Sequence, residues 1–335
     1  MKKINFAVIG HGNIGRRHVH HILAHPDARL VAVCDTDPEK LRLAELEGVP
    51  VFSELAQMLQ QIDADVINVC TPNYLHHPHT VAALQQGFHV VCEKPMAISS
   101  QQCSEMISAA ESAEKTIFVV KQNRYNEPVQ QVKKLLGNGI LGVTYFIHIN
   151  CFWNRNPYYY SESSWRGKKE TDGGCLFTQF SHFIDILYYL FGEIQDVEGK
   201  TVNFNHPYTD VEDTGSFVMK TRNGALVNFN FSTCSYEKNM EGAITILSEN
   251  GTVKIGGQYL NTIEYQHIKD HLLPAITIQA KANDYGQYQG SMSNHDRVID
   301  NVIKTLRGTE QAMTNAHEGK KVVEMIEQMY AAALR

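Results

Sequence analysis

The apolar residues of the first third of the chain alternate between short continuous runs and helical spacing. Continuous runs at residues 4–9, 30–34, 65–70 and 89–92 predict buried strands. Apolar residues recur at helical spacing after residue 13, and helices are also predicted near 53–61 and 78–86. Because strands and helices alternate in this way, we predict a doubly wound parallel sheet.

The pattern changes after about residue 122, where one strand follows another. The predicted strands lie at residues 143–152, 215–221, 226–231, 243–247 and 252–255, and Asn-Gly pairs at 223–224 and 250–251 predict hairpin turns. Helical patterns occupy residues 176–191, 294–306 and 318–334. We therefore predict an α/β chain with a parallel-sheet domain over residues 1–122 and, over residues 123–335, an α/β domain with a large, mostly antiparallel open sheet. The C-terminal helices are free to pack back onto the first domain.

The helix predicted over residues 176–191 has a polar stripe as well as an apolar one. Thr178, His182 and Asp185 share one face, and the apolar stripe consists of Phe180, Ile184, Leu187 and Phe191. Polar groups on an otherwise apolar helix need a partner or a function. For His182 alone, the simpler interpretation is a core histidine bonded to a carbonyl, and Asp185 alone could be a surface acid.

Composition excludes several classes of function. The 335 residues are 43% hydrophobic and 20% charged without a low-complexity tract, as in ordinary globular proteins of two domains. The formal net charge of -6 argues against a broad nucleic-acid-binding face. No stretch approaches the ~18 apolar residues of a membrane span, and no secretory leader is evident, so we expect a cytoplasmic protein.

Cysteine and histidine spacing does not predict a metal centre. The seven cysteines include no C-x-x-C pair, so reduced thiols are expected. The densest histidine cluster, His76-His77-x-His79, lies at a loop-to-helix junction with no matching cysteine or carboxylate spacing. We therefore expect no metal ligands.

A glycine-rich turn connects the first predicted strand to the first helix. Gly10, Gly12 and Gly15 follow the G-x-G-x-x-G spacing, and Asp35 ends the second strand about twenty residues later. In a Rossmann fold such glycines let the backbone and a helix N-terminus approach a pyrophosphate, and the acid binds the adenosine ribose. Asp35 would repel a 2′-phosphate, which favours NAD over NADP. The alternative is a solvated turn residue before Pro38.

Two further motifs follow the next predicted strands, at the edge where a parallel sheet binds ligands. They are Thr71-Pro72-Asn73-x-x-His76 and Glu93-Lys94-Pro95. Together with the glycine turn and Asp35, these motifs resemble the glucose-fructose oxidoreductase, inositol dehydrogenase and MocA (Gfo/Idh/MocA) family. Gly173-Gly174 and residues 179–185 resemble that family's catalytic helix. The resemblance covers nearly the whole chain and implies an NAD-dependent oxidoreductase acting on CH–OH groups.

Several segments resemble one branch of that family, the WlbA-type UDP-2-acetamido-2-deoxy-D-glucuronate 3-dehydrogenases. These segments are residues 121–124, 152–155, 158–159, 165–167, 212–215 and 238–242. The branch implies oxidation of the C3 hydroxyl of a UDP-N-acetylated sugar or uronic acid in bacterial surface polysaccharide (lipopolysaccharide, O-antigen) biosynthesis. Many family members have Asp four residues before the catalytic His, whereas this chain has Thr178, which counts against an inositol substrate.

The resemblance also implies site residues. His182 is the expected base for the hydroxyl proton, and Lys94 the expected ammonium that polarises the reacting oxygen. The expected cofactor-binding residues are Gly10, Gly12, Asn13, Ile14, Gly15, Asp35, Thr71, Pro72, Asn73, His76, Glu93, Lys94 and Gln122. The expected substrate-binding residues are Lys94, Asn123, Arg124, Arg155, Tyr159, Arg166, Thr178, Gln179, His182, Asp185 and His295.

Two alternatives to this function stay open. One is an NAD-dependent dehydrogenase of a free sugar or polyol, of the inositol or glucose type. The other is a non-catalytic sensor of a sugar nucleotide or NADH, against which the intact Lys94 and His182 count. The expected partners are a sugar or UDP-sugar, with no nucleic acid and no membrane. Because an open sheet leaves one face uncovered, we also expect a homodimer or homotetramer through that sheet.

Overall fold

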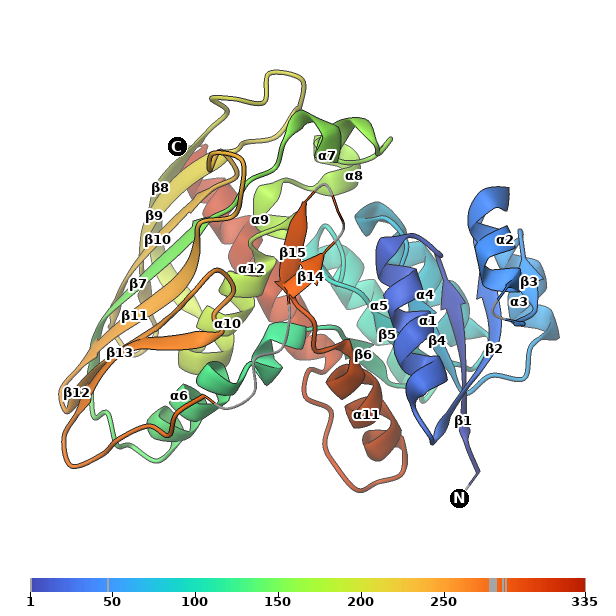
Figure 1. Cartoon of the computed structure of the whole chain (residues 1–335), viewed down its shortest axis with the longest axis horizontal. Helices are drawn as coiled ribbons and strands as arrows, with labels where there is room; N and C mark the ends of the chain where they lie inside the picture. Colours follow the sequence, from blue (N-terminus) through green and yellow to red (C-terminus); the bar gives the residue numbers. More distant parts are fainter. Residues whose placement is uncertain (1, 47, 277–281, 285, 287, 335) are drawn as a thin grey trace. The chain divides into compact units, whose positions relative to one another are not determined.

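The computed structural model describes residues 2–46, 48–276, 282–284, 286 and 288–334. The chain forms two compact units (Figure 1). Unit 1 comprises Met1–Lys121 and His295–Val323, and unit 2 comprises Gln122–Asn294 and Glu324–Arg335. Among the described residues, no helix has the length and apolar character that a membrane span requires.

Unit 1 is built on a six-stranded parallel sheet, as the alternating pattern predicts. The strand order is β3-β2-β1-β4-β5-β6, so the chain runs outward from β1 to one edge, returns to β4 and runs to the other edge. The strands are β1 (Ile4–Ile9), β2 (Ala28–Cys34), β3 (Val51–Phe52), β4 (Val66–Val69), β5 (His89–Cys92) and β6 (Ile117–Val119). The point between β1 and β4, where the strand order reverses, is where doubly wound sheets bind ligands.

Helices connect these strands. They are α1 (Asn13–Ala24), α2 (Pro38–Glu45), α3 (Leu55–Gln61), η1 (Asn73–Leu75), α4 (His76–Gln85) and α5 (Ser100–Ser112). Near the C-terminus, α11 (His295–Leu306) packs against α1, and α12 (Ala316–Ala333) begins in unit 1. The core strands are buried on both faces, as in parallel sheets covered on each side.

Unit 2 contains a seven-stranded sheet in the order β13-β12-β11-β7-β10-β9-β8. Its strands are β7 (Thr144–Phe152), β8 (Ile194–Val202), β9 (Thr214–Thr221), β10 (Leu226–Ser232), β11 (Glu241–Ser248), β12 (Gly251–Gly256) and β13 (Thr262–Ile268). β10 and β7 pair in parallel and the other neighbours are antiparallel, which confirms the predicted mostly antiparallel sheet. A separate hairpin pairs β14 (Ala282–Asp284) with β15 (Gln289–Met292).

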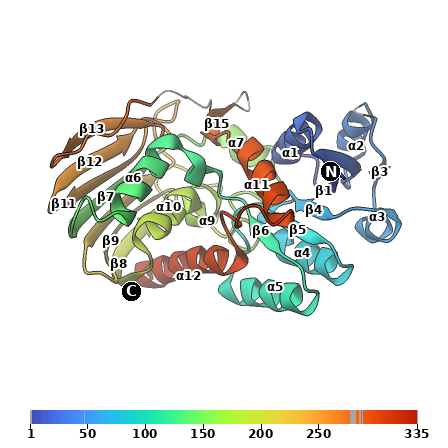
Figure 2. The same cartoon turned by 90° about the horizontal axis from the view of Figure 1, so that it is seen from below.

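Helices cover one face of the seven-stranded sheet. Figure 2 shows α6 (Glu127–Gly137) and α10 (Ser181–Phe191) on the same side of it. The short helices of this unit are η2 (Gln122–Tyr125), α7 (Pro157–Ser161), α8 (Lys169–Asp172) and α9 (Cys175–Thr178). Alternate residues of the strands, such as Ile147, Phe217 and Phe229, are fully buried. The apolar layer under these helices therefore fixes which face of the sheet is interior.

The prediction of one unbroken helix over residues 176–191 is wrong. The segment forms α9 and α10, separated at Gln179 and Phe180. The backbone N–H of Phe180 bonds the carbonyl of Cys175, five residues back, which interrupts the regular ladder. The Phe180 ring packs against Trp153 and Phe231, and this packing accompanies the break. Residues 181–187 are buried all round, so α10 is a core helix without an exposed polar face.

Candidate active site

The glycine turn in unit 1 has the geometry that a dinucleotide pyrophosphate requires. Gly10 has φ +88°, and a Cβ there would lie 2.7 Å from the Cys70 carbonyl oxygen. A Cβ on Gly15 would lie 1.8 Å from the Gly10 carbonyl oxygen, so only glycine lets α1 pack this closely. At Gly12 a Cβ would meet no described atom within 4 Å. Gly12 directly precedes α1, whose first N–H groups, from Asn13 onward, are the type of group that binds phosphate oxygens.

Asp35 ties the end of β2 to the glycine turn. Its Oδ2 accepts the backbone N–H of His11 at 2.7 Å, and its Oδ1 accepts that of Asp37 at 2.9 Å. These bonds orient a carboxylate beside the turn. Each oxygen keeps acceptor capacity for ribose hydroxyls, so the turn and Asp35 fit NAD.

Polar residues follow β4 and β5 at the same edge of the sheet. The buried His76 bridges the two connections, since its Nε2 lies 2.8 Å from the Thr71 carbonyl oxygen and its Nδ1 lies 2.6 Å from the Pro95 carbonyl oxygen. Burial lowers the pKa of His76. Its side chain therefore braces the segments that contain Pro72, Asn73 and Lys94.

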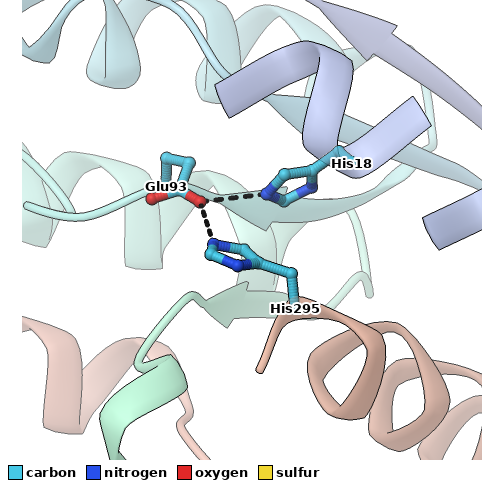
Figure 3. Close-up of side chains that lie close together, drawn as sticks. All are labelled: His18, Glu93 and His295. Atoms are coloured by element: carbon cyan, nitrogen blue, oxygen red, sulfur yellow. Dashed lines mark hydrogen bonds and ion pairs between the residues drawn. The ribbon is translucent and has the colours of Figure 1, made fainter. Parts of the chain in front are cut away.

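Glu93 is buried at the end of β5, beside the half-buried Lys94. Its carboxylate contacts His18 and His295 (Figure 3). The structure thus places His295, which we expected among the substrate-binding residues, against Glu93 within unit 1. Lys94 follows directly in the chain, so these contacts hold the segment that carries the expected catalytic ammonium.

His182 lies in the first turn of α10 in unit 2 and is 5% exposed. Its Nε2 lies 3.3 Å from the hydroxyl of Ser291 in β15, and that hydroxyl accepts a bond from the Gln122 amide at 2.8 Å. The candidate base, the candidate cofactor residue Gln122 and the hairpin β14–β15 therefore form one hydrogen-bonded chain. Ser291 had not been expected here, because nothing in its local sequence distinguishes it.

Arg124 and Asp185 form a buried ion pair with each other. The Arg124 Nε donates to Asp185 Oδ2 at 3.0 Å, and its Nη2 donates to Oδ1 at 2.8 Å, while the two side chains are 0% and 2% exposed. The guanidinium also stacks over the Tyr189 ring, 4.7 Å from its centroid. This bidentate pair links η2 to α10 and so fixes the helix that carries His182.

A cluster of arginine and aromatic side chains lies around Tyr159. The guanidinium of Arg166 lies 4.3 Å from the Tyr159 ring centroid, and that of Arg155 lies 5.2 Å from it. The Arg166 Nη2 also donates to the Tyr288 hydroxyl at 3.2 Å, and the Gln179 amide donates to the Tyr159 hydroxyl at 2.8 Å. Burial raises the pKa of Tyr159 to about 12, although the two arginines lower it.

Several expected substrate-binding residues keep buried polar atoms that bond no described protein atom. The amide nitrogen and oxygen of Asn123, the Gln179 Oε1, and the Nε atoms of Arg155 and Arg166 are all in this state. Buried polar atoms are almost always hydrogen-bonded in native proteins, to protein, water or ligand. Water or a polar ligand can therefore bond these atoms of unit 2.

The side chain of Thr178 contacts the carboxylate of Asp172, six residues earlier in the chain. The Thr178 hydroxyl bonds the carboxylate of the buried Asp172, whose second oxygen accepts the Gly167 N–H at 2.6 Å. Asp172, from the short helix α8, thus places a carboxylate against Thr178. Gly173 and Gly174, both with positive φ, form the turn between Asp172 and α9. The contact between Asp172 and Thr178 depends on this turn.

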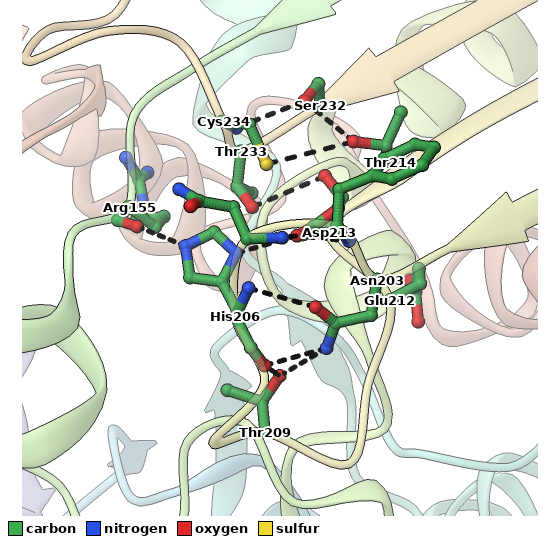
Figure 4. Close-up of polar contacts among 12 residues, drawn as sticks. Arg155, Asn203, His206, Thr209, Glu212, Asp213, Thr214, Ser232, Thr233 and Cys234 are labelled. Carbon is green, nitrogen blue, oxygen red and sulfur yellow. Dashed lines mark hydrogen bonds and ion pairs between the residues drawn. The ribbon is translucent and has the colours of Figure 1, made fainter.

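The segment that carries Arg155 is anchored by the connection between β8 and β9 (Figure 4). His206 bonds the Arg155 carbonyl oxygen through Nε2 at 2.6 Å and Asp213 Oδ2 through Nδ1 at 3.0 Å. Asp213 also accepts the backbone N–H groups of Phe204 and Asn205. Burial raises the pKa of Asp213, but these hydrogen bonds outweigh burial and hold it below its usual value. The network fixes the backbone from which the Arg155 side chain projects.

Glu212 caps the N-terminus of α9, which precedes the helix of His182. Its Oε1 accepts the Cys175 N–H at 2.9 Å and the Tyr330 hydroxyl at 2.6 Å, and the Tyr330 oxygen accepts the Leu176 N–H at 3.1 Å. Burial raises the pKa of Glu212 to about 7 despite these bonds. The folded state therefore binds the Glu212 proton more tightly than the unfolded state does.

Glu212→Gln is expected to remove part of the pH dependence of folding. With a pKa of about 7 in the folded protein and an ordinary value near 4.5 when unfolded, wild type loses stability as pH rises from about 4.5 to about 7. Between pH 5 and pH 8, the free energy of unfolding of wild type should fall by about 2 to 3 kcal/mol more than that of the variant, as measured by urea unfolding. Glu198→Gln, at an exposed position, serves as the control. An equal difference between wild type and Glu212→Gln at both pH values would contradict the prediction.

The chain belongs to the Gfo/Idh/MocA family of oxidoreductases. Residues 4–121 match the family's NAD-binding Rossmann fold, and residues 129–254 match the Gfo/Idh/MocA C-terminal domain. The protein is accordingly an NAD-dependent oxidoreductase that binds NAD(H) through its Rossmann unit, in agreement with the geometry of the glycine turn and Asp35.

Individual relatives span different parts of the chain. The crystal structure of the WlbA dehydrogenase from Bordetella pertussis in complex with NADH and UDP-GlcNAcA is 36% identical, with a TM-score of 0.89, and the match covers 99% of this chain and 97% of that one. The 2,7-anhydro-N-acetylneuraminate hydratase of Escherichia coli (strain K12) is 26% identical over 95% of this chain and 81% of its own. The D-glucoside 3-dehydrogenase of the same organism is 35% identical over 42% of this chain and 41% of its own.

Proposed function

We propose that this oxidoreductase oxidises the C3 hydroxyl of a UDP-N-acetylated hexosamine or uronic acid, for bacterial surface polysaccharide synthesis. The full-length similarity to a WlbA dehydrogenase in complex with NADH and UDP-GlcNAcA carries the proposal. The buried, unpartnered polar atoms of Asn123, Gln179 and the two arginines support it, because a sugar nucleotide offers many hydrogen-bonding groups.

In this proposal the chain's own side chains handle the hydroxyl proton and the charge on the reacting oxygen. When bound, NAD supplies the hydride acceptor. His182 takes the hydroxyl proton, and the contact of its Nε2 with Ser291, which Gln122 supports, orients the ring. Lys94 donates to the reacting oxygen and stabilises the negative charge that develops there. The pair of Arg124 and Asp185 holds α10, and therefore His182, in position.

The arginine cluster suits an anionic part of the substrate. Arg155 and Arg166 place two guanidinium groups around Tyr159, and both retain an N–H that bonds no described protein atom. A guanidinium fork matches the oxygens of a carboxylate or a phosphate. We therefore assign this cluster to the uronate carboxylate or the diphosphate, with Asp172 as the neighbouring acid that balances the charge.

A free sugar or glycoside is the second candidate substrate. The similarity to a D-glucoside 3-dehydrogenase over part of the chain favours it. A free sugar or glycoside carries no anionic group that would bind the remaining N–H groups of Arg155 and Arg166. A sensor without turnover would need neither Lys94 nor His182.

Absorbance of NADH tests the proposed function. Purified protein is mixed with NAD and, separately, UDP-N-acetylglucosaminuronate, UDP-N-acetylglucosamine, glucose, a glucoside and myo-inositol. NADH formation confined to a UDP-sugar, and lost in His182→Ala, is the expected result. Formation with a free sugar, glucoside or polyol would move the assignment to the second candidate. Absence of turnover with every substrate, despite measured NAD binding, would favour a sensor.

The open face of the seven-stranded sheet is the proposed subunit interface. Leu226 of β10 and Leu247 of β11 both pair with Phe146 of β7, so the three form an apolar row on the face opposite α6 and α10. We expect a homodimer or homotetramer by sedimentation equilibrium, and Leu226→Asp should shift it to smaller species because it places charge in that row. Tyr236→Asp, at an exposed position off these strands, is the control. A wild-type monomer would contradict the proposal.

A further inference from the structure

A buried cluster in unit 1 lies directly behind the segment that carries Lys94. His18 comes from α1, Glu93 directly follows β5 and His295 begins α11 (Figure 3). The side chains of His18 and His295 are 0% exposed and that of Glu93 is 5% exposed. Glu93 Oε1 lies 2.9 Å from His18 Nε2 and 3.3 Å from His295 Nε2.

The hydrogen bonds of His18 define its proton position. The amide nitrogen of Asn68, in the middle of β4, donates to His18 Nδ1 at 2.8 Å. With the Asn68 amide in this orientation, Nδ1 is an acceptor and the ring proton is on Nε2, where it is donated to Glu93. A metal ion would need an unprotonated Nε2, so this arrangement favours a hydrogen-bond chain over a metal centre.

The chain of hydrogen bonds continues from Glu93 to the backbone of Lys94. Glu93 Oε2 accepts the Lys94 N–H at 3.0 Å. A buried carboxylate is costly unless hydrogen bonds satisfy it. Burial by itself raises the pKa of Glu93, but the hydrogen bond from His18 and the nearby His295 imidazole outweigh burial and hold it well below its usual value. Asn68, His18 and Glu93 thus connect β4, α1 and β5 at the edge of the sheet where the cofactor binds.

We propose that His18 is a positioning residue for the active site, holding the Glu93 carboxylate in the place from which it fixes the backbone of Lys94. Because His18 lies on the helix that follows the glycine turn, the position of the Lys94 ammonium is tied to the helix that receives the pyrophosphate. The inference rests on the proposed role of Lys94 in the reaction. His18 lies on the same face of α1 as the buried Gly15, Val19 and Ile22, which is the pattern by which it could have been found in the sequence.

Four variants of the full-length enzyme test this role. His18→Met keeps approximate volume without the N–H, whereas His18→Gln retains an N–H near the position of Nε2. Glu93→Gln and the double variant His18→Met/Glu93→Gln show whether His18 acts through Glu93. His20→Met, exposed on the same helix, is the control. Two quantities are measured: kcat, and the rate at which an amine-reactive acylating reagent modifies Lys94 in the enzyme without substrate, followed by peptide mass spectrometry.

We expect His18→Met to lower kcat about 10- to 100-fold and to change the rate of Lys94 acylation several-fold, because the segment loses its anchor. His18→Gln should recover most of both, and the double variant should be no worse than Glu93→Gln. The inference is overturned by wild-type behaviour of His18→Met, by equal damage in His18→Met and His18→Gln, or by losses that multiply in the double variant. Stoichiometric zinc that copurifies with wild type and is lost in His18→Met would also overturn it.

The acylation measurement keeps the two proposals separate. If Lys94→Ala retains turnover, the proposed chemistry of Lys94 fails, and acylation still reports whether His18 and Glu93 fix the Lys94 segment. If Lys94→Ala abolishes turnover while acylation is the same in wild type and His18→Met, the positioning role fails alone.

Discussion

Alanine in place of Lys94 or His182 is expected to lower kcat by about 10²- to 10⁴-fold while NADH binding persists. Each variant removes a group that acts on the reacting hydroxyl: the base for its proton in one case, the ammonium that stabilises its charge in the other. The His182 side chain is 5% exposed and bonded to Ser291, so His182→Ala removes the imidazole from a buried, hydrogen-bonded position. The measurement is steady-state turnover of the accepted substrate, with NADH affinity from fluorescence titration.

Matched controls separate this chemistry from folding. Lys200→Ala removes an exposed lysine of β8 and should leave kcat and NADH affinity unchanged. Lys94→Arg keeps a positive charge at the same position and should retain more activity than Lys94→Ala. Near-normal turnover by Lys94→Ala would exclude its proposed role, and near-normal turnover by His182→Ala would exclude His182 as the base.

Arg124→Met is expected to lower the free energy of unfolding by about 3 to 5 kcal/mol. The substitution leaves Asp185 as a buried carboxylate without its bidentate partner, and removing one member of a buried pair is more costly than removing both. The measurement is chemical denaturation at neutral pH. Activity should fall as well, because η2 and α10 lose the ion pair that connects them.

The double variant Arg124→Met/Asp185→Leu distinguishes a lost pair from lost packing. If the unpaired charge dominates, the double variant should be more stable than either single variant. A cost below about 1 kcal/mol for Arg124→Met would contradict the prediction. Costs that simply add in the double variant would assign the loss to packing of Arg124 against Tyr189.

The buried strands of unit 1 are the elements that local sequence predicts best. The runs 4–9 and 89–92 coincide with β1 and β5, because a strand buried on both faces reads as a continuous apolar run. β8 and β13 were not among the predicted strands, since most of their residues are exposed or half-buried and show little apolar alternation. They are strands because ladders to β9 and β12 pair their backbones.

The active-site residues also fall into those that a local motif predicts and those whose partners are distant in the chain. The glycine turn, Asp35 and the segments around Thr71 and Lys94 stand beside predicted strand ends, so the sequence alone indicates the cofactor site. The partners of the other residues are distant in the chain: 61 residues separate Arg124 from Asp185, and 169 separate Gln122 from Ser291. No local pattern predicts such pairs.

The sequence by itself determined the doubly wound dinucleotide-binding unit, because strand periodicity, glycine spacing and the acid that follows β2 are local requirements of backbone geometry and phosphate binding. Its further motifs indicated the oxidoreductase family by resemblance. Only the tertiary structure decided how the site residues are used. It paired Arg124 and Asp185 with each other, brought Asp172 to Thr178, and placed His18 and His295 against Glu93. A buried polar group must bond whichever group packing brings to it, and long-range packing is set by the whole chain.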